Sequence, residues 1–218
     1  MTQVFSPSAD TWLRLLAGLG AVAVAGVLLV AGGIVRSDYV TGVGVVPRQP
    51  VPFSHEHHVG GLGIDCRYCH TSVEVAANAG FPPTHTCMSC HSQIWTGAPM
   101  LAPVRESLAT DTALRWERVA RVPDFVYFDH HVHIAKGVGC VTCHGRVDKM
   151  PLLARAEPFQ MQWCLDCHRD PAPNLRPSEE VFDMAWSPQG DREALAERLM
   201  SENHVQTAHL TDCYTCHR

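Results

Sequence analysis

Five short segments of this 218-residue chain share one arrangement of two cysteines and a histidine, Cys-x-x-Cys-His. In this spacing two thiols can form thioether bonds to one porphyrin, and the next residue can place its imidazole on the iron. The segments use all ten cysteines of the sequence. The predicted thioether residues are Cys66, Cys69, Cys87, Cys90, Cys140, Cys143, Cys164, Cys167, Cys213 and Cys216. The predicted proximal iron ligands are His70, His91, His144, His168 and His217.

Cysteine pairs at this spacing also bind zinc or form redox disulfides. Zinc would gather the pairs into four-ligand sets and would not require a histidine directly after each second cysteine. With 14 histidines in the chain, five chance occurrences at these five places have a probability on the order of one in a million. We therefore predict five covalently bound haem c groups, each with its iron.

The first 48 residues differ in kind from the rest and predict a membrane anchor. Residues 15–35 form an uncharged run between Arg14 and Arg36, and about 20 apolar residues span a bilayer core. A cleavable signal peptide is the alternative, because Ala21-Val22-Ala23 resembles a processing site. The run is longer than the apolar region of an ordinary signal peptide, so we expect a retained helix at about residues 13–36.

Charge does not orient this helix, since a single arginine lies on each side of it. Covalent haem attachment takes place outside the cytoplasm, however. We therefore expect a single-pass protein of the cell (inner) membrane, with its N-terminus in the cytoplasm and its haem domain on the periplasmic side.

The remainder of the sequence contains a duplication. The pattern Phe-x-His-x-x-His occurs at Phe53–His58 and again 75 residues later at Phe128–His133, and each copy precedes two attachment motifs. The duplication predicts one dihaem module at 49–110 and a second at 111–176. A C-terminal segment at 177–218 carries the fifth motif.

Long helices are not expected in these modules, because proline and glycine are spread throughout them. We predict a multihaem cytochrome c fold, a small α/irregular domain of short helices and loops wrapped on five haems that form much of its core. One clear helix is expected at Asp191–Ser201, where Leu195 and Leu199 recur at helical spacing. A short extended segment is expected at Phe125–Phe128.

Nine histidines outside the motifs are available as the sixth ligand that a low-spin haem iron requires. The repeated Phe-x-His-x-x-His pattern resembles that of class III multihaem cytochromes, in which the first histidine ligates the nearest haem. That resemblance implies that His55 serves the haem of His70 and that His130 serves the haem of His144.

The second histidine of each pair is implied by the same resemblance to reach an iron elsewhere in the cluster. His58 and His133 are therefore expected to serve neighbouring haems and to tie the two halves together. His57 and His131, which lie beside them in the sequence, are the alternatives.

The fifth distal ligand is open between methionine and histidine. Met150 is favoured, because it interrupts the repeat and follows His144 by six residues. A methionine ligand would raise the potential of its haem above that of haems with two histidines. The alternatives are Met161, His204 and His209.

The formal net charge of −5 omits the propionates that haem would add. Arg146, Arg169 and Arg218 each follow an attachment motif and are candidates to pair with them. The sequence has no basic patch and no phosphate-binding glycine loop, so no nucleic-acid partner is expected. The Gly60–Gly63 turn is expected to let the backbone pass close to a porphyrin face.

Several longer segments resemble the pentahaem membrane-anchored cytochrome c subunit of alternative complex III, a quinol:electron acceptor oxidoreductase. The resemblance covers most of the chain and is weakest from about Pro177 to Thr211. The matching segments are Val40–Gly44, Pro50–His55, His58–His70, Cys87–Trp95, Pro123–Phe128, Gly137–Asp148 and Met161–Arg169.

The resemblance implies an electron-transfer subunit that relays electrons through five haems on the outer face of the membrane. The implied donor is a quinol, usually menaquinol, and the acceptor is a cytochrome c, another small carrier or an oxidase. The implied partners are an iron–sulfur subunit resembling molybdopterin oxidoreductases, polytopic quinol-binding subunits and a monohaem cytochrome c. The chain itself is then an electron carrier and not the quinol-oxidising site.

Two other functions fit parts of the sequence. A stand-alone membrane-anchored quinol dehydrogenase would pass electrons to a periplasmic reductase, but its family commonly has a methionine just after the first motif, where this chain has Thr71-Ser72-Val73. A pentahaem nitrite reductase would require an open iron and often an attachment motif that ends in lysine, whereas all five motifs here end in histidine.

Overall fold

The structure is a computed structural model that describes residues 4–217. The chain divides into two compact units, one up to Gly42 and one from Val43 onward. The boundary follows a four-residue helix, α2 (Asp38–Thr41), which ends at Gly42 in a left-handed conformation with φ 72°. Each unit is described separately below.

The first unit is mainly one long helix, α1 (Ala9–Arg36), which includes the expected residues 13–36. Its 28 residues give a length of about 42 Å, more than the bilayer core of about 30 Å. Mean hydropathy over its most apolar window is 2.4, and none of its residues is buried. Among the residues described, this helix is the one long and apolar enough to cross a membrane.

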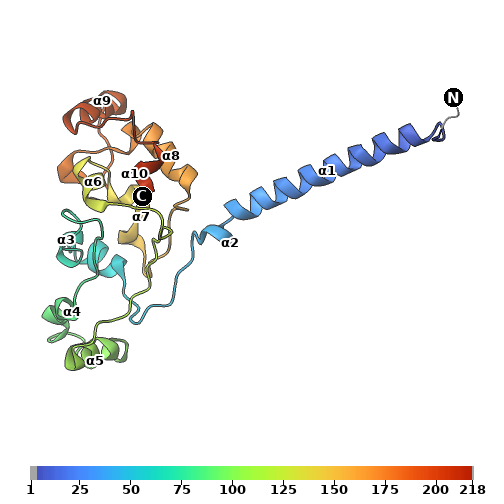
Figure 1. Cartoon of the computed structure of the whole chain (residues 1–218). Coiled ribbons are helices and arrows are strands. Elements are labelled where there is room, and N and C mark those ends of the chain that lie inside the picture. The colour runs from blue at the N-terminus through green and yellow to red at the C-terminus, as the bar shows by residue number, and fades with distance from the viewer. Residues whose placement is uncertain (1–3, 218) are drawn as a thin grey trace. The chain divides into compact units, whose positions relative to one another are not determined.

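The second unit consists of short helices and turns joined by irregular segments (Figure 1). Within residues 4–217, β pairing is confined to an isolated bridge between Val138 and Leu175. The α-helices are α3 (Cys66–Cys69), α4 (Thr84–His91), α5 (Ala102–Thr110), α6 (His130–Ala135), α7 (Cys140–His144), α8 (Met161–Arg169), α9 (Arg192–Glu202) and α10 (Cys213–Cys216). The other helical turns are η1 (Glu56–Gly61), η2 (Pro99–Leu101), η3 (Val147–Lys149), η4 (Ala172–Asn174) and η5 (Ser178–Glu180).

Local residue chemistry explains where several of these helices begin. The Asp191 side chain accepts hydrogen bonds from two backbone N–H groups of α9, which confirms the helix expected from Asp191. Asp65 and Asp129 cap α3 and α6 in the same way. The expected extended segment begins in a turn at Asp124 and Phe125 and forms no strand.

Buried apolar side chains are few in the second unit and are mostly small. The best-packed cluster joins Val51, Leu101 and Val104, close to the second attachment motif. A domain of this size ordinarily buries about two thirds of the surface of its unfolded chain around an apolar core. The described residues do not form such a core from side chains, as expected if porphyrins occupy it.

The two halves of the duplication hold each other by reciprocal backbone contacts. The Ala77 carbonyl of the first half accepts a hydrogen bond from the His130 N–H at 3.2 Å, and the Met150 carbonyl of the second half accepts one from the Glu56 N–H at 3.0 Å. Gly60 lies so close to the Asp148 carbonyl that a side chain there would overlap it. In the structure this glycine therefore admits the other half of the chain, rather than only a porphyrin face.

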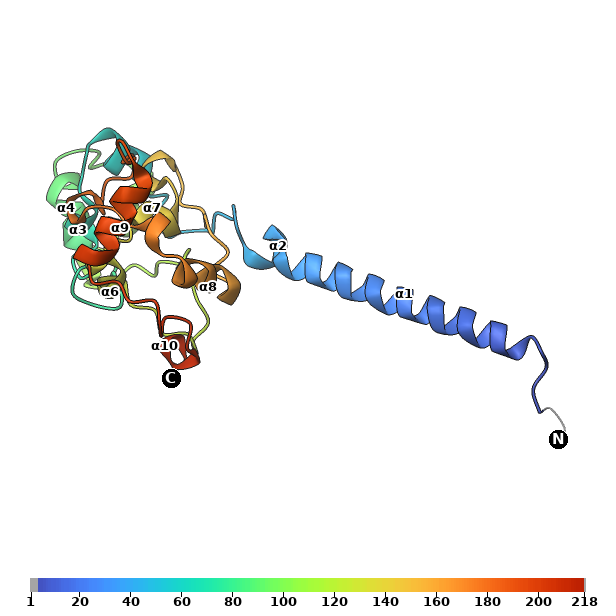
Figure 2. The same ribbon diagram turned by 90° about the horizontal axis from the view of Figure 1, so that it is seen from above.

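In both views α3 and α4 lie near each other on one side of the second unit, and α7 lies between them and α8 (Figures 1 and 2). A direct contact joins α3 and α4, since the Tyr68 hydroxyl of α3 lies 3.0 Å from the Ser89 hydroxyl of α4. Another joins α8 to the end of the chain, because His168 of α8 bonds the Leu210 carbonyl just before α10.

We predict that Gly137→Ala destabilises the protein more than Gly190→Ala does. Both glycines have a left-handed backbone conformation, with φ 81° and 79°. An added Cβ therefore lowers the free energy of unfolding by about 1–2 kcal/mol at either position. At Gly137 it would also lie 2.6 Å from the Asn203 amide nitrogen and 2.7 Å from the Arg176 carbonyl oxygen, and overpacking adds about 1–3 kcal/mol. Chemical denaturation measures both losses, and equal losses would contradict the packing at Gly137.

Candidate haem sites

Each attachment motif forms a single helical turn or the end of a short helix, so its two thiols and its histidine lie close together. In four motifs the Nδ1 atom of the histidine lies within hydrogen-bond distance of a backbone carbonyl. Because a carbonyl only accepts, Nδ1 carries the proton and Nε2 is left free to bind a metal. The pairs are His70 with Gly80, His91 with Ile94, His168 with Leu210 and His217 with Phe125.

The histidines of the two Phe-x-His-x-x-His segments face the motif histidines across a narrow gap. The ring centroids of His130 and His144 are 6.3 Å apart and the rings are nearly parallel, at 7°. His133 and His168 are 6.2 Å apart. His58 and His91 are also 6.2 Å apart.

This separation fits an iron between the two rings. A metal–nitrogen bond is about 2 Å long, so two imidazoles that share one metal have ring centroids about 6 Å apart. Packed aromatic rings also have centroids about 4.5–7 Å apart, so the assignment depends on the orientation of the rings as well as on their distance. The distal rings are oriented for this role as well, because Nδ1 of His58, His130 and His133 lies 2.7–2.8 Å from a backbone carbonyl oxygen.

His55 lies close to the first attachment motif of each half, near His70 and His144. Burial, together with the neighbouring His70, His58 and His144, lowers its pKa to about 4. Burial likewise lowers the pKa of His144 to about 4. Both rings are therefore neutral at physiological pH, which is the form that ligates a metal.

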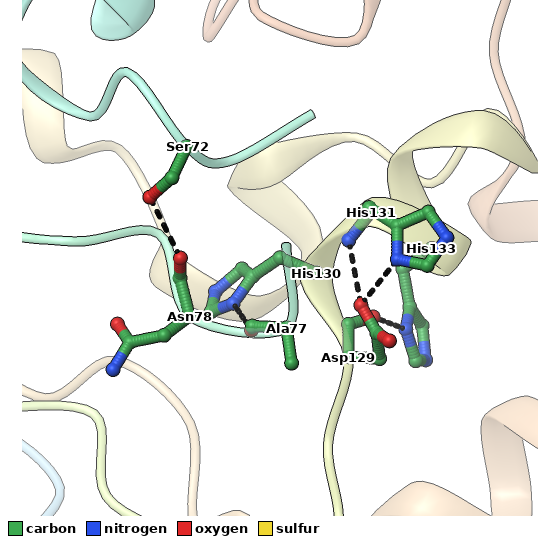
Figure 3. Close-up of polar contacts among 7 residues, drawn as sticks. All are labelled: Ser72, Ala77, Asn78, Asp129, His130, His131 and His133. Carbon is green, nitrogen blue, oxygen red and sulfur yellow. Dashed lines mark hydrogen bonds and ion pairs between the residues drawn. The ribbon is translucent and has the colours of Figure 1, made fainter. Parts of the chain in front are cut away.

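Phenylalanines position both distal histidines of each segment. Phe53 packs edge-on against His55 at 4.9 Å and stacks on His58 at 4.3 Å. Phe128 repeats the arrangement with His130 at 4.8 Å and His133 at 4.5 Å. Figure 3 shows the rest of the second support: the Ala77 carbonyl holds His130, and Ser72 bonds the Asn78 carbonyl in the same loop.

One expectation about the distal histidines is wrong. His58 and His133 were expected to tie the two halves together, yet they face His91 and His168, which belong to their own halves. The halves are joined instead by the reciprocal loops, since the His130 Nδ1 of the second half bonds the Ala77 carbonyl of the first.

The neighbouring histidines have other contacts. His57 is exposed and stacks against Trp95 at 6.3 Å. Nδ1 of His131 lies 2.7 Å from the carboxylate of Asp129, which is also shown in Figure 3.

The structure brings the Phe125 ring, and not a second imidazole, against His217, at 5.8 Å. Met150 lies elsewhere, with its carbonyl bonded to Glu56 and its methyl group near Gly145. Its role as fifth distal ligand stays a prediction.

The three alternatives to Met150 are all on the surface. Met161 is the first residue of α8 and is 67 % exposed. His204 is exposed too, and the His209 side chain lies against the carboxylate of Asp212.

The cysteines of the described residues lie in five separate pairs and not in one shared metal cluster. No disulfide joins any two of the ten cysteines, all of which lie within the described residues. Within residues 4–217, no group of three or more His, Cys, Asp or Glu side chains has the geometry to hold a metal ion. Burial raises the pKa of Cys143 to about 12 and that of Cys140 to about 11, so neither is the reactive thiolate that redox disulfide exchange requires.

Electrostatic neighbours among the thiols indicate the order of the motif helices. Cys87 raises the pKa of the Cys69 thiol, and Cys66 raises that of Cys140. Cys216 raises the pKa of Cys164 in the same way. Cys143 interacts with both cysteines of α8. The five motifs therefore follow one another in space as second, first, third, fourth and fifth.

Two of the arginines proposed as propionate partners have carboxylate partners in the chain. Arg146 donates two hydrogen bonds to the buried Asp148, at 2.6 and 2.7 Å, and it lowers the pKa of that carboxyl. Arg169 pairs with Asp166 at 3.2 Å. Arg218 lies outside the described residues. The sequence did not single out Arg176, which is the buried arginine beside the third motif.

Comparison with models of known protein families finds no match for this chain. Among curated proteins, the chain is similar to the multihaem cytochrome c subunit of the menaquinone reductase of Nitratidesulfovibrio vulgaris (strain Hildenborough). The two are 29 % identical over 176 residues, which cover 78 % of this chain and 77 % of the relative. The similarity supports a multihaem c-type cytochrome of the membrane-associated type, without fixing the number of haems.

We predict that His130→Ala converts one haem from low-spin to high-spin, because one iron loses its second imidazole. His131→Ala is the matched control, since His131 lies on the same helix but its Nδ1 faces the Asp129 carboxylate. Electron paramagnetic resonance and optical spectra of the oxidised proteins report the spin state. A wild-type spectrum for His130→Ala would remove His130 from the set of ligands.

Proposed function

We propose that this chain is a membrane-anchored pentahaem cytochrome c that relays electrons between a quinone pool and an acceptor outside the membrane. The observation that carries the proposal is the spacing of three facing histidine pairs, whose rings are held 6.2–6.3 Å apart. The similarity to a multihaem cytochrome c subunit supports the same conclusion. Haem c, once bound, supplies the one-electron chemistry.

The residues of the chain hold and orient the cofactors. In this proposal the ten cysteines attach five porphyrins, and the histidine of each motif is the proximal ligand. His55, His58, His130 and His133 are the distal ligands of four irons, and Met150 is retained as the candidate for the fifth. Ligands fixed by carbonyls and phenylalanines keep their geometry when the iron changes charge, so little reorganisation accompanies each transfer.

A relay also requires the sites to be adjacent. The paired distal histidines meet this requirement, because His55 and His58 are three residues apart, as are His130 and His133. Each segment therefore holds two irons beside each other. The reciprocal loops between the halves and the His168–Leu210 contact support a continuous row with the second and fifth motifs at its ends.

The anchor and the partners complete the proposal. Helix α1 would hold the haem unit at the cell membrane, with the N-terminus in the cytoplasm and the haems on the periplasmic side. The chain would be one subunit of a larger assembly, as in alternative complex III. Its partners would be an iron–sulfur subunit, polytopic quinone-binding subunits and a monohaem cytochrome c. The quinone site would lie on those partners, as the resemblance to alternative complex III implies.

The direction of electron flow has two candidates. Oxidation of menaquinol is the direction that the resemblance to alternative complex III implies. The relative is named a menaquinone reductase, which favours electron entry from a periplasmic donor and delivery to menaquinone. Electron transfer along a row of haems is reversible, so the potentials of the donor and acceptor decide the direction.

The test is purification of the full-length chain from membranes in detergent, together with whatever subunits remain bound. We expect five covalent haems per chain by pyridine haemochrome and mass spectrometry, and subunits that co-purify. Menaquinol with oxidised cytochrome c, and reduced cytochrome c with menaquinone, assay the two directions. Free thiols or bound zinc would refute the proposal, and quinol oxidation by the isolated chain would favour the stand-alone dehydrogenase.

We predict that loss of the third haem splits the relay while loss of the fifth does not. In Cys140→Ala/Cys143→Ala the middle of the row is interrupted, so stopped-flow reduction should separate into a fast phase and a slow phase. In the matched variant Cys213→Ala/Cys216→Ala only an end site is lost, and the remaining haems should be reduced in one phase. A single phase in both variants would contradict the order of the sites.

A further inference from the structure

Arg176 is a buried cation without an anionic partner in the part of the chain that the structure describes. Its residue is 6 % exposed. Its guanidinium donates hydrogen bonds to the carbonyls of Glu180 and Asp183, at 3.2 and 2.8 Å, and lies 5.0 Å above the centre of the Trp186 ring. Its Nε is buried without a hydrogen-bond partner.

A buried charge without an anionic partner destabilises the folded protein, and its presence points to a functional role. Arginine remains protonated inside proteins, and an ion removed from water without a partner costs several kcal/mol. The carboxylates of Asp183 and Glu180 interact with Arg176 electrostatically, but neither forms an ion pair with it. Carbonyl groups and an aromatic face offset only part of this cost.

The position of the guanidinium gives the reason for its burial. It fills the space where a side chain of Gly139 would stand, and Gly139 directly precedes Cys140 and caps α7. The backbone N–H of Arg176 also donates a hydrogen bond to the Gly137 carbonyl at 2.9 Å. The backbone N–H of Cys140 donates one to the Val181 carbonyl at 3.1 Å. Arg176 and the residues after it thus hold the turn that carries the third motif.

We propose that Arg176 is a positioning residue whose buried charge raises the reduction potential of the haem attached to Cys140 and Cys143. This inference rests on the proposed function. The oxidised haem carries one more positive charge than the reduced haem, so a nearby cation in a medium of low dielectric constant disfavours the oxidised form. We assign the effect to charge, because the guanidinium lies beside Gly139, the residue directly before the attachment cysteine Cys140.

The third motif stands in the middle of the row of sites. A haem of raised potential there holds an electron more strongly than its neighbours do. Arg176 would therefore determine where an electron rests while the relay waits for its acceptor, without touching either axial ligand of that haem.

The test compares three variants of the full-length haem protein by optical redox titration. Arg176→Met removes the charge and keeps the length of the side chain, and Arg176→Lys keeps the charge. Arg192→Met is the matched control. Arg192 and Arg176 both line a cavity of about 170 Å³. Arg192 is exposed, however, and its guanidinium donates a hydrogen bond to the Pro173 carbonyl at 2.9 Å. We expect Arg176→Met to lower the midpoint potential of one haem, whereas the other two variants keep all the wild-type potentials.

Each outcome bears on the inference separately from the proposed function. Wild-type potentials in Arg176→Met with all its haems bound would overturn the role of Arg176 and leave the relay intact. An equal shift in Arg176→Lys would overturn it as well, because charge would not be the cause. Absence of covalent haem in the wild-type protein would refute the proposed function itself.

A second variant covers the case in which Arg176→Met does not accumulate. Gly139→Ala keeps the charge but adds a Cβ where the guanidinium lies, and its φ of −69° suits any L-residue. The guanidinium must move away from the thioether edge, so the potential of the same haem should fall by a smaller amount. An unchanged potential in Gly139→Ala with five haems bound would also overturn the inference.

Discussion

The structure depends on a fixed gap between pairs of imidazole rings. The ring centroids of the three pairs are 6.2–6.3 Å apart, which leaves room for a metal bound by both imidazoles. Five of the six rings, all but His144, have a backbone carbonyl at hydrogen-bond distance from Nδ1. The turns and loops of the second unit are the means of supplying those carbonyls. This explains why a chain with little regular structure still specifies its candidate sites closely.

The duplication makes that support mutual. The loop after the first motif of each half provides a carbonyl to the histidine segment of the other half: Ala77 to His130, and Met150 to Glu56. Exchange of this kind resembles a two-fold interface between identical subunits, in which each partner gives what it receives. Each histidine segment thus receives a backbone contact from the other half, and both halves belong to one compact unit. The fifth motif lies outside this exchange, and its histidine has Phe125 as its neighbour instead of an imidazole.

The sequence predicted best what depends on short spacing. The attachment motifs, the apolar helix and the capped helix at Asp191 all follow from a few adjacent residues, and the structure has the two helices as expected. The partners of His58 and His133 could not be found in this way, because His91 and His168 lie 33 and 35 residues further along the chain. Arg176 was missed because its neighbours in the sequence do not indicate that it is buried. Its burial arises from contacts with Gly139 and Trp186. The signal available in the sequence was Gly139 itself, a residue without a side chain directly before an attachment cysteine.

The sparse apolar core connects stability with function. Within the described residues, the largest buried cluster contains only Val51, Leu101 and Val104 with a few partly buried neighbours, which is far less than the conformational entropy of some 170 ordered residues requires. Porphyrins would supply the missing apolar surface, and their covalent attachment would make that contribution permanent. The same groups would then serve as the packing that holds the chain together and as the conductors that it positions. Under that constraint a side chain beside a motif cannot be chosen for packing alone, and the buried charge of Arg176 is a case where packing is given up for an electrostatic effect.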